Sequence, residues 1–175
     1  MIPDKNEKVL TCKYRKQKIL EQVIAPSLSK TAPRAFIQLL TETPSVELFD
    51  TLYKTIISKD VESTTWLKKF ISFGGLFSMN EVLQSHISEA GQLDENDEDN
   101  VHIKIISGCV KCYLALYKRQ GIQPFVDKAI VSTLGDLMSC HGIIGPRIIA
   151  LKILGKVSQD SPEGHRYRKK KHFMF

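Results

Sequence analysis

The sequence predicts an all-α protein, and three observations support this. Apolar residues recur three and four positions apart along most of the chain, which is the spacing of one helix face. Glycines and prolines interrupt this pattern at intervals, and neither a two-residue hairpin turn nor a sustained apolar–polar alternation is present. A helical unit in the centre has a copy further along the chain. We therefore expect stacked helices and no central sheet.

The central unit is W-L-K-K-F-I-S-F-G-G-L-F-S-M-N-E-V-L, residues 66–83. One apolar stripe precedes Gly74-Gly75 and a second follows, so we expect two helices that are separated by the glycines. A similar pattern lies 46 residues on, where Trp66, Leu67, Phe70, Gly75 and Leu76 are matched by Cys112, Tyr113, Leu116, Gly121 and Ile122. Because a helical period of about 40–47 residues is typical of armadillo and HEAT repeats, we expect an armadillo-like helical-repeat superhelix.

Further helices are expected on both sides of this unit. Residues 6–24 predict a first helix, which ends at Ala25-Pro26 because a residue before proline is steered away from the helical region. Pro33 and Pro44 suit the first turns of the next two helices, and Asp60 is a candidate N-cap for the helix after them. Later helices are expected at 101–118, within 125–138 and at 147–157, the last opened by Pro146.

The apolar stripes of these helices are expected to pack into one core. In the helix before Asp60 the stripe comprises Val46, Leu48, Phe49, Leu52, Ile56 and Ile57. In the central unit and its copy, the residues expected to be buried are Trp66, Phe70, Leu76, Leu114 and Leu116. In the last helix they are Ile148, Ile149, Leu151, Ile153 and Leu154.

Residues 88–101, S-E-A-G-Q-L-D-E-N-D-E-D-N-V, differ from the rest of the chain. They hold six acids, no base and a single leucine, so they cannot build a core and are expected to form a mobile loop. The carboxylates in D-E-N-D-E-D offer calcium binding as an alternative. The spacing of a calcium-binding EF-hand fails, because that loop needs a glycine at its sixth position and a flanking helix pair. We expect no metal site here.

The net charge is +6 and the isoelectric point is about 9.1. The basic residues concentrate at Lys13, Arg15, Lys16 and Lys18, and again at Arg166, Arg168, Lys169, Lys170 and Lys171. The second group is either a solvated tail, residues 166–175, or a contact for RNA or anionic membrane. We expect no basic surface with interleaved aromatic side chains, so specific nucleic-acid recognition is not expected. Neither a membrane span nor a signal peptide is indicated, which favours a cytosolic or nuclear location.

No active site is expected. The pair Cys109-x-x-Cys112 lacks the two further ligands of a structural zinc site, and it falls inside an amphipathic helix, where a redox pair would not lie. We expect two buried small side chains instead. Cys140 and His141 are neighbours in sequence and would point about 100° apart on a helix. The common phosphate-binding, serine-nucleophile and zinc-protease motifs are absent, so neither enzymatic activity nor a cofactor is predicted.

Several stretches resemble the amino-terminal regulatory region of diaphanous-related formins. K-T-A-P-R-A-F-I-Q-L-L is similar to the family's proline-led helix, and W-L-K-K-F-I-S-F-G-G-L resembles the tryptophan-to-Gly-Leu stretch of its first repeat. C-Y-L-A-L-Y-K-R-Q-G looks like a helix of the next repeat, and A-L-K-I-L-G-K-V followed by E-G-H looks like the last one. The acidic segment stands where formins carry a variable loop. The resemblance covers residues 31–165 in order and spacing.

The resemblance implies regulation by binding. In this family a Rho-type small GTPase docks on the amino-terminal segment, here residues 1–30, and on the first armadillo repeats. The implied GTPase-binding residues are Lys13, Arg15, Lys16 and Lys59. An amphipathic autoregulatory helix of the formin lies in a groove of the repeats, and the groove positions fall at Lys118, Lys156 and Gln159. Lys118 stands where the family has a groove asparagine. Lys156 and Gln159 stand where the family has two small apolar residues.

The resemblance also implies a cytoplasmic, cytoskeleton-associated protein that organises actin only indirectly, because the actin-assembling domain of formins has no counterpart in this chain. Two other interpretations stay open. In the first, the chain is a generic armadillo adaptor that binds an unrelated peptide. In the second, it is a basic helical protein that contacts RNA or anionic membrane through residues 166–171.

Overall fold

The computed structural model describes residues 32–90, 100–125, 127–140 and 143–161. In these residues the regular secondary structure is helical and no strand occurs, which confirms the all-α class. The helices are α2 (Pro33–Glu42), α3 (Val46–Ile57), α4 (Val61–Ser72), α5 (Gly75–Ala90), α6 (Val101–Gln120), the short 3-10 helix η2 (Gln123–Phe125), α7 (Lys128–Ser139) and α8 (Ile144–Asp160). Across the described ranges, no helix has the length and apolar character needed to cross a bilayer. The helix expected at 6–24 and the tail 166–175 lie outside them.

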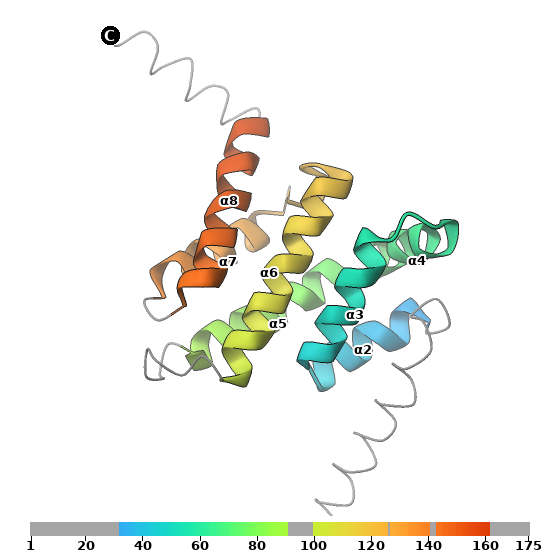
Figure 1. The fold of residues 1–175 in the computed structure, drawn as a ribbon, viewed down its shortest axis with the longest axis horizontal. Helices are drawn as coiled ribbons and strands as arrows, with labels where there is room; N and C mark the ends of the chain where they lie inside the picture. The colour runs from blue at the N-terminus through green and yellow to red at the C-terminus, as the bar shows by residue number, and fades with distance from the viewer. Residues whose placement is uncertain (1–31, 91–99, 126, 141–142, 162–175) are drawn as a thin grey trace, which may run out of the picture.

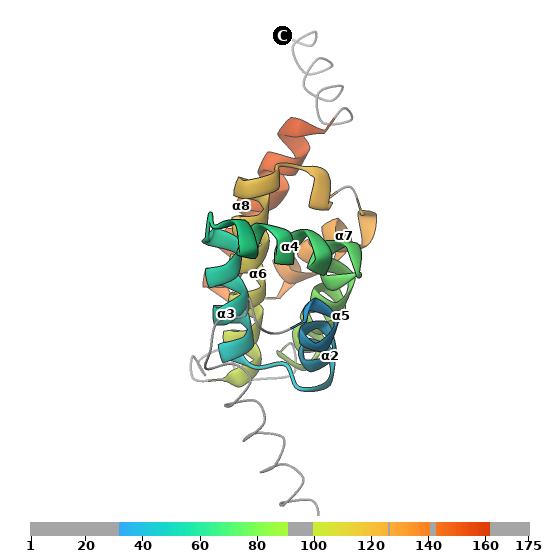
Figure 2. The same ribbon diagram turned by 90° about the vertical axis from the view of Figure 1, so that its right-hand side faces the viewer.

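The helices lie in two layers. In Figure 1, α3, α6 and α8 lie side by side in the front layer, and α2, α5 and α7 lie behind them. Figure 2 shows the two layers from the side, with α4 crossing at the end of the stack near α2 and α3. The central helix is α6, which packs against α3, α5 and α8. The front layer therefore exposes one long surface made of α3, α6 and α8.

A continuous apolar core runs between the layers from Phe36 to Val157. At one end the rings of Trp66 and Phe70 stack with their centroids 5.3 Å apart and their planes 10° apart. The Phe36 ring meets Trp66 edge-on at a centroid distance of 5.4 Å. Trp66, Phe70 and Leu116 are buried as expected. The helices therefore hold together through one shared core.

Side chains cap the helices at the positions where polar residues precede the apolar stripes. Asp60 caps α4, as predicted, and its carboxylate accepts a hydrogen bond from the Ser63 amide at 2.6 Å. Hydrogen bonds from the Ser58 hydroxyl and the Ser63 amide lower the pKa of Asp60 to about 2. Ser45 caps α3 in the same way. Gly74 and Gly121 have φ of 87° and 68°, so both predicted helix breaks lie at glycines in the left-handed region.

Three residues expected to be buried are exposed. Ile57 is 53% exposed, Ile148 49% and Leu151 58%. Each stripe is wider than the face that its helix turns to the core. In α3 the inward face is already filled by Leu48, Phe49, Leu52 and Ile56, and in α8 it is filled by Ala150, Ile153 and Val157. Leu76, Leu114, Ile149 and Leu154 are partly buried and pack against the core.

The bounds of several segments also differ from expectation. In the segment predicted as a loop, residues 88–90 belong to α5 and Val101 begins α6, while residues 91–99 lie outside the described residues. The helix continues because Ile87 and Ala90 still pack against the core, whereas the sequence around them is polar. The last helix begins at Ile144, so Pro146 stands in its first turn rather than before it. The helix expected from Phe125 begins at Lys128, after the cap Asp127.

The internal repeat does not align helix with helix. Trp66, Leu67 and Phe70 lie in α4, and their partners lie in the second half of the longer α6. Gly75 is the first residue of α5, whereas its match Gly121 follows the end of α6 and precedes η2. The matched apolar positions are buried in both places except Leu76 and Ile122, which are partly buried. The 46-residue spacing therefore relates two buried stripes rather than two whole repeats.

Candidate functional site

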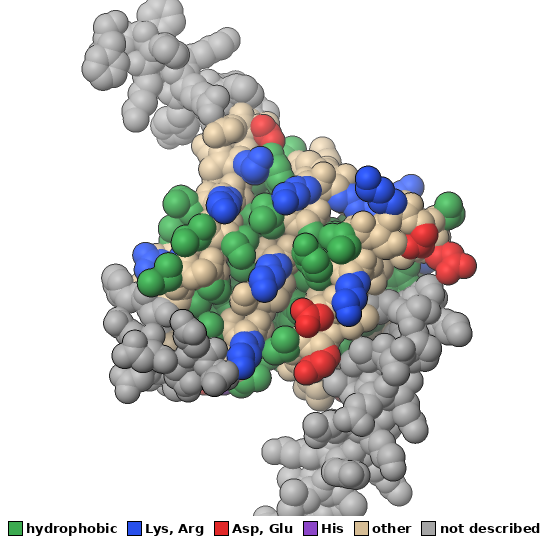
Figure 3. Space-filling view, viewed as in Figure 1, with side chains coloured by type: hydrophobic (Ala, Val, Ile, Leu, Met, Phe, Trp, Pro, Cys, Tyr) green, Lys and Arg blue, Asp and Glu red, His purple; other side chains and the backbone are tan. Residues whose placement is uncertain are grey.

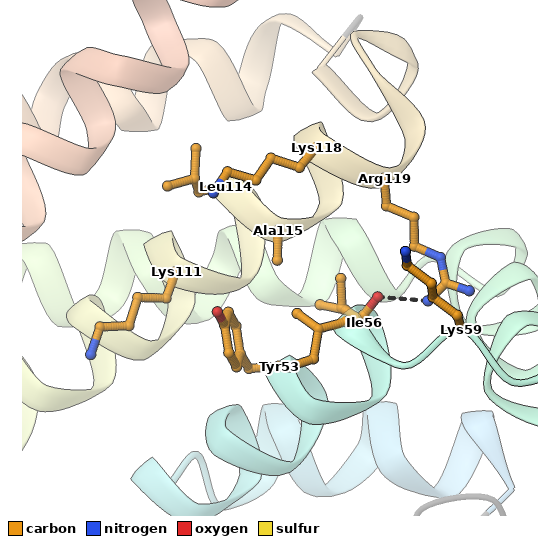
Figure 4. A pocket seen from close by; sticks show the side chains of 9 residues that line it. Tyr53, Ile56, Lys59, Lys111, Leu114, Ala115, Lys118 and Arg119 are labelled. Carbon is orange, nitrogen blue, oxygen red and sulfur yellow. Dashed lines mark hydrogen bonds between the residues drawn. The ribbon is translucent and has the colours of Figure 1, made fainter.

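A groove of about 340 Å³ opens on the front layer between α3 and α6 (Figure 4). Its residues come from the second half of each helix and from the turn after α3. They are Tyr53, Ile56, Ile57, Lys59, Lys111, Leu114, Ala115, Lys118 and Arg119. We call this feature the α3–α6 groove.

Apolar side chains form the floor of the groove. In Figure 4, Ala115 of α6 points toward α3, where Tyr53 and Ile56 lie, and Leu114 lies on α6 beside Lys118. Tyr53 is 38% exposed, and its neighbour one turn on, Ile57, is more than half exposed. Accessible apolar groups in a concave setting are typical of a binding surface, because a partner that covers them removes them from water.

Lysines form the rim. Lys59 follows α3, and Lys111 and Lys118 lie two turns apart on α6; all three are exposed and line the groove. Figure 3 shows basic side chains distributed over the whole front layer, with most of the acidic ones on the side of α3 and one near the end of α8. The rim therefore favours a partner that presents carboxylates or phosphates around an apolar centre.

Arg119 fixes the end of the groove. Its guanidinium donates hydrogen bonds to the carbonyl oxygens of Thr55, Ile56 and Ser58 at 3.3, 2.6 and 2.7 Å, and to the Thr64 hydroxyl at 2.6 Å. The bond to Ile56 is drawn in Figure 4. The last carbonyls of a helix have no partner within it, and a cation there also suits the helix dipole. Arg119 therefore ties together the ends of α3 and α6 and the start of α4.

Close packing holds α3 against α6. Gly108 faces Phe49 so closely that a Cβ added to the glycine would lie 2.7 Å from the Phe49 Cβ. One turn further along α6, the Cys112 thiol donates to the Phe49 carbonyl oxygen at 3.4 Å. The two helices can approach this closely only because α6 presents small residues to α3.

The predicted site residues fall into three groups. Lys13, Arg15 and Lys16 lie outside the described residues. Lys59, predicted for GTPase binding, and Lys118, predicted for the partner-helix groove, line the same groove.

The third group lies on α8. Lys156 is exposed, and its ammonium lies 5.5 Å from the centroid of the Tyr117 ring of α6. Gln159 is exposed one turn further on. These two residues share the front layer with the α3–α6 groove but do not line it.

Sequence reasoning missed the apolar floor. Tyr53 received no role, and Ile57 and Leu114 were assigned to the core. A usable signal is present, because Tyr53 and Ile57 stand four residues apart and adjoin Lys54 and Lys59. When apolar residues alternate with lysines along one edge of a helix's apolar stripe, that edge is expected to face solvent.

Cys109 and Cys112 do not suit catalytic or metal chemistry. Cys109 and Cys112 are fully buried, as predicted, and burial raises the pKa of both thiols well above the usual range. They therefore stay protonated, and the thiolate is the form that attacks or binds metal. Within the ranges that the structure describes, no three His, Cys, Asp or Glu side chains come together in a way that suits a metal ion.

A second, smaller hollow of about 290 Å³ lies on the other side of the molecule, between the end of α2 and α5. It is lined by Thr41, Pro44, Glu81, Val82, Ser85 and His86. The Nδ1 atom of His86 lies 2.8 Å from that of His102 at the start of α6. This pair joins two helices and does not adjoin the α3–α6 groove.

Comparisons with protein-family models, curated proteins and solved structures find no significant match for this chain. The resemblance to formins therefore stands on the sequence stretches alone.

Proposed function

We propose that this chain is a non-enzymatic, armadillo-like regulatory module that binds a Rho-family small GTPase through the α3–α6 groove. The observation that carries the proposal is the composition of the groove, which combines an accessible apolar floor with a rim of three lysines. The formin resemblance supplies the identity of the partner. In this role the protein acts in the cytoplasm, at the cytoskeleton, and affects actin only through its partners.

The layered helices support the armadillo part of the proposal. Armadillo arrays stack helices so that one layer lines an extended surface on which peptides and proteins bind. Here α3, α6 and α8 lie side by side in such a layer, with α2, α5 and α7 behind. The layer offers a long surface without requiring any catalytic group.

Charge supports the GTPase part. The effector faces of such GTPases carry several carboxylates, and the groove presents Lys59, Lys111 and Lys118 at its rim. Opposite charges across a rim raise the association rate and make the affinity depend on salt. An apolar contact in the centre, at Tyr53 and Leu114, then supplies the part of the binding energy that salt does not weaken.

An amphipathic autoregulatory helix is a second candidate partner for the same layer. One observation favours it: Lys118 and Lys156 are exposed, so their charges need not be buried when a helix docks between α6 and α8. The long stems of both lysines can lie along the apolar side of such a helix while the ammonium groups stay in water.

The test is binding to Rho-family GTPases loaded with a GTP analogue or with GDP. The double variant Lys59→Glu/Lys118→Glu should bind the GTP-analogue form about tenfold more weakly, because two rim attractions become repulsions. The matched control is Lys68→Glu/Lys128→Glu, which makes the same charge change on exposed lysines that do not line the groove. The control should bind like the parent.

Reversal of Lys13, Arg15 and Lys16 to glutamate tests the amino-terminal segment separately. If that triple variant alone loses binding, the segment is the docking surface and the groove is not. If the parent shows no preference for the GTP-analogue form of any Rho-family member, the proposed function is wrong. Binding of an unrelated peptide by the groove would then favour the generic adaptor.

A further inference from the structure

The outer edge of α8 carries an exposed apolar stripe that the proposed function does not use. Ile144, Ile148 and Leu151 are 69%, 49% and 58% exposed. They stand four and three residues apart, so they share one face of the helix. Gly155 continues this face one turn further, and a Cβ added to it would have no neighbour within 4 Å outside the backbone of its own helix. We call these four residues the α8 edge.

The α8 edge lies at the open end of the front layer. The opposite face of α8 packs against the core through Ala150, Ile153 and Val157. Lys156 marks the side that adjoins α6, because its ammonium lies over the Tyr117 ring. In Figure 3, hydrophobic side chains lie over α8 at the margin of the molecule, with basic side chains next to them.

Basic residues border the apolar stripe. At about 100° per residue, Arg147 falls on one flank of the stripe and Lys152 on the other, with Lys156 beyond it. No acidic residue occurs from Ile144 to Gln159. The edge therefore has an apolar centre and flanks of a single charge.

We propose that the α8 edge docks on the surface of an anionic lipid bilayer. A helix that lies in the membrane interface inserts its apolar stripe among the acyl chains and holds lysine or arginine at the level of the headgroups. Charge complementarity selects this occupant, because anionic headgroups attract basic side chains and zwitterionic ones do not. A second copy of the chain fits less well, since pairing two α8 edges would bring basic flanks together.

This contact is separate from the α3–α6 groove, which lies on α3 and the neighbouring side of α6. Docking through α8 would leave Tyr53, Ile57 and Lys59 free to meet a GTPase. The two contacts use different residues, so both can form in one complex.

The experiment is co-sedimentation of the full chain with phosphatidylcholine vesicles, with and without phosphatidylserine. The parent should bind only the vesicles that contain phosphatidylserine, and less at higher salt. Ile148→Gln/Leu151→Gln should lose most of this binding, and Lys152→Gln should weaken it about fivefold, the effect of one basic residue at such a surface. The matched control is Ile57→Gln/Lys54→Gln, which makes similar changes on exposed residues of α3. It should bind vesicles like the parent.

Two further results decide the proposal. A variant with Arg166, Arg168, Lys169, Lys170 and Lys171 changed to glutamine should keep binding that still depends on Ile148 and Leu151. If binding instead disappears with that variant and is unchanged by Ile148→Gln/Leu151→Gln, the terminal basic run binds lipid and the α8 edge does not. Retention on RNA without binding to vesicles would also overturn the proposal. Helical circular dichroism of each variant shows that a loss of binding is not a loss of folding.

Discussion

At the scale of single residues, the structure shows contacts that no pattern in the sequence reveals. His86 and His102 are 16 positions apart, yet their Nδ1 atoms lie at hydrogen-bond distance. Such a bond needs one nitrogen to donate and the other to accept, so two protonated rings cannot form it. Arg119 is a similar case, because its carbonyl partners lie in another helix. Sequence reasoning finds caps such as Asp60, whose partner lies three residues away, but it misses polar contacts between distant elements.

The histidine pair predicts a dependence of stability on pH. Burial, and then the charge of His102, lower the pKa of His86 below its ordinary value of 6.5, while Glu89 opposes them. Among the described groups, Glu81 also lines the hollow beside His86. The folded chain therefore binds a proton at His86 less tightly than the unfolded chain does. Neutral His86 stabilises the fold fully above about pH 6.5, and this stabilisation is lost as the pH falls below that value. The melting temperature should therefore decrease on acidification.

This expectation is checked by thermal melts of the parent and of His86→Gln. Circular dichroism detects the unfolding, from about pH 7.5 to about pH 5. Glutamine can still donate to His102 but does not titrate, so the variant should show a shallower decrease. Equal slopes in the two proteins would mean that carboxylates, and not the histidine pair, carry the acid dependence.

At the scale of elements, helix existence could be predicted but the width of each buried face could not. Glycines, prolines and caps mark where helices break, and the described helices begin and end close to those marks. The stripe around α3 includes Ile57 and that around α8 includes Ile148 and Leu151, although all three face solvent. A single helix cannot show which edge of its stripe a neighbour will cover. These exposed margins are the surfaces that we propose as contacts. Sequence reasoning assigned them to the core because their residues are apolar and continue the buried stripes.

The packing of α6 on α3 gives a prediction at the same scale. Gly108→Ala should destabilise the fold by about 1–3 kcal/mol, because the new methyl group would meet the Phe49 Cβ, which cannot move without its backbone. The matched control is Gly155→Ala in α8, where nothing lies within 4 Å of the added carbon. There alanine should be neutral or stabilise by up to about 1 kcal/mol, since it is the better helix former. Urea unfolding measures both variants. Equal effects at the two positions would mean that α3 and α6 do not pack as closely as described.

At the scale of the whole molecule, sequence reasoning predicted stacked helices and a binding role, but it did not predict which of its candidate residues lie together. Lys59 and Lys118 were assigned to two different partners, and the structure brings them to one groove. They are 59 residues apart, and only the packing of α3 beside α6 makes them neighbours. The period of 46 residues was a weaker guide, because it pairs α4 with half of α6. The relation of one helix to the next is set by side-chain packing, which periodicity does not encode.

The continuous core predicts that the described helices unfold together. In arrays whose repeats contact only their neighbours, one end can unfold before the other. Here apolar contacts run without interruption from Phe36 in α2 to Val157 in α8, and α6 reaches helices of both layers.

Trp66, the single tryptophan, reports on the α4 end through its stacking on Phe70. Leu134 is fully buried in α7, near the other end. Leu134→Ala should cost about 2–5 kcal/mol and should lower the urea midpoint seen by tryptophan fluorescence as much as that seen by circular dichroism. If the fluorescence midpoint stays at the parent value while the circular dichroism midpoint falls, the two ends unfold independently and the core is not one cooperative unit.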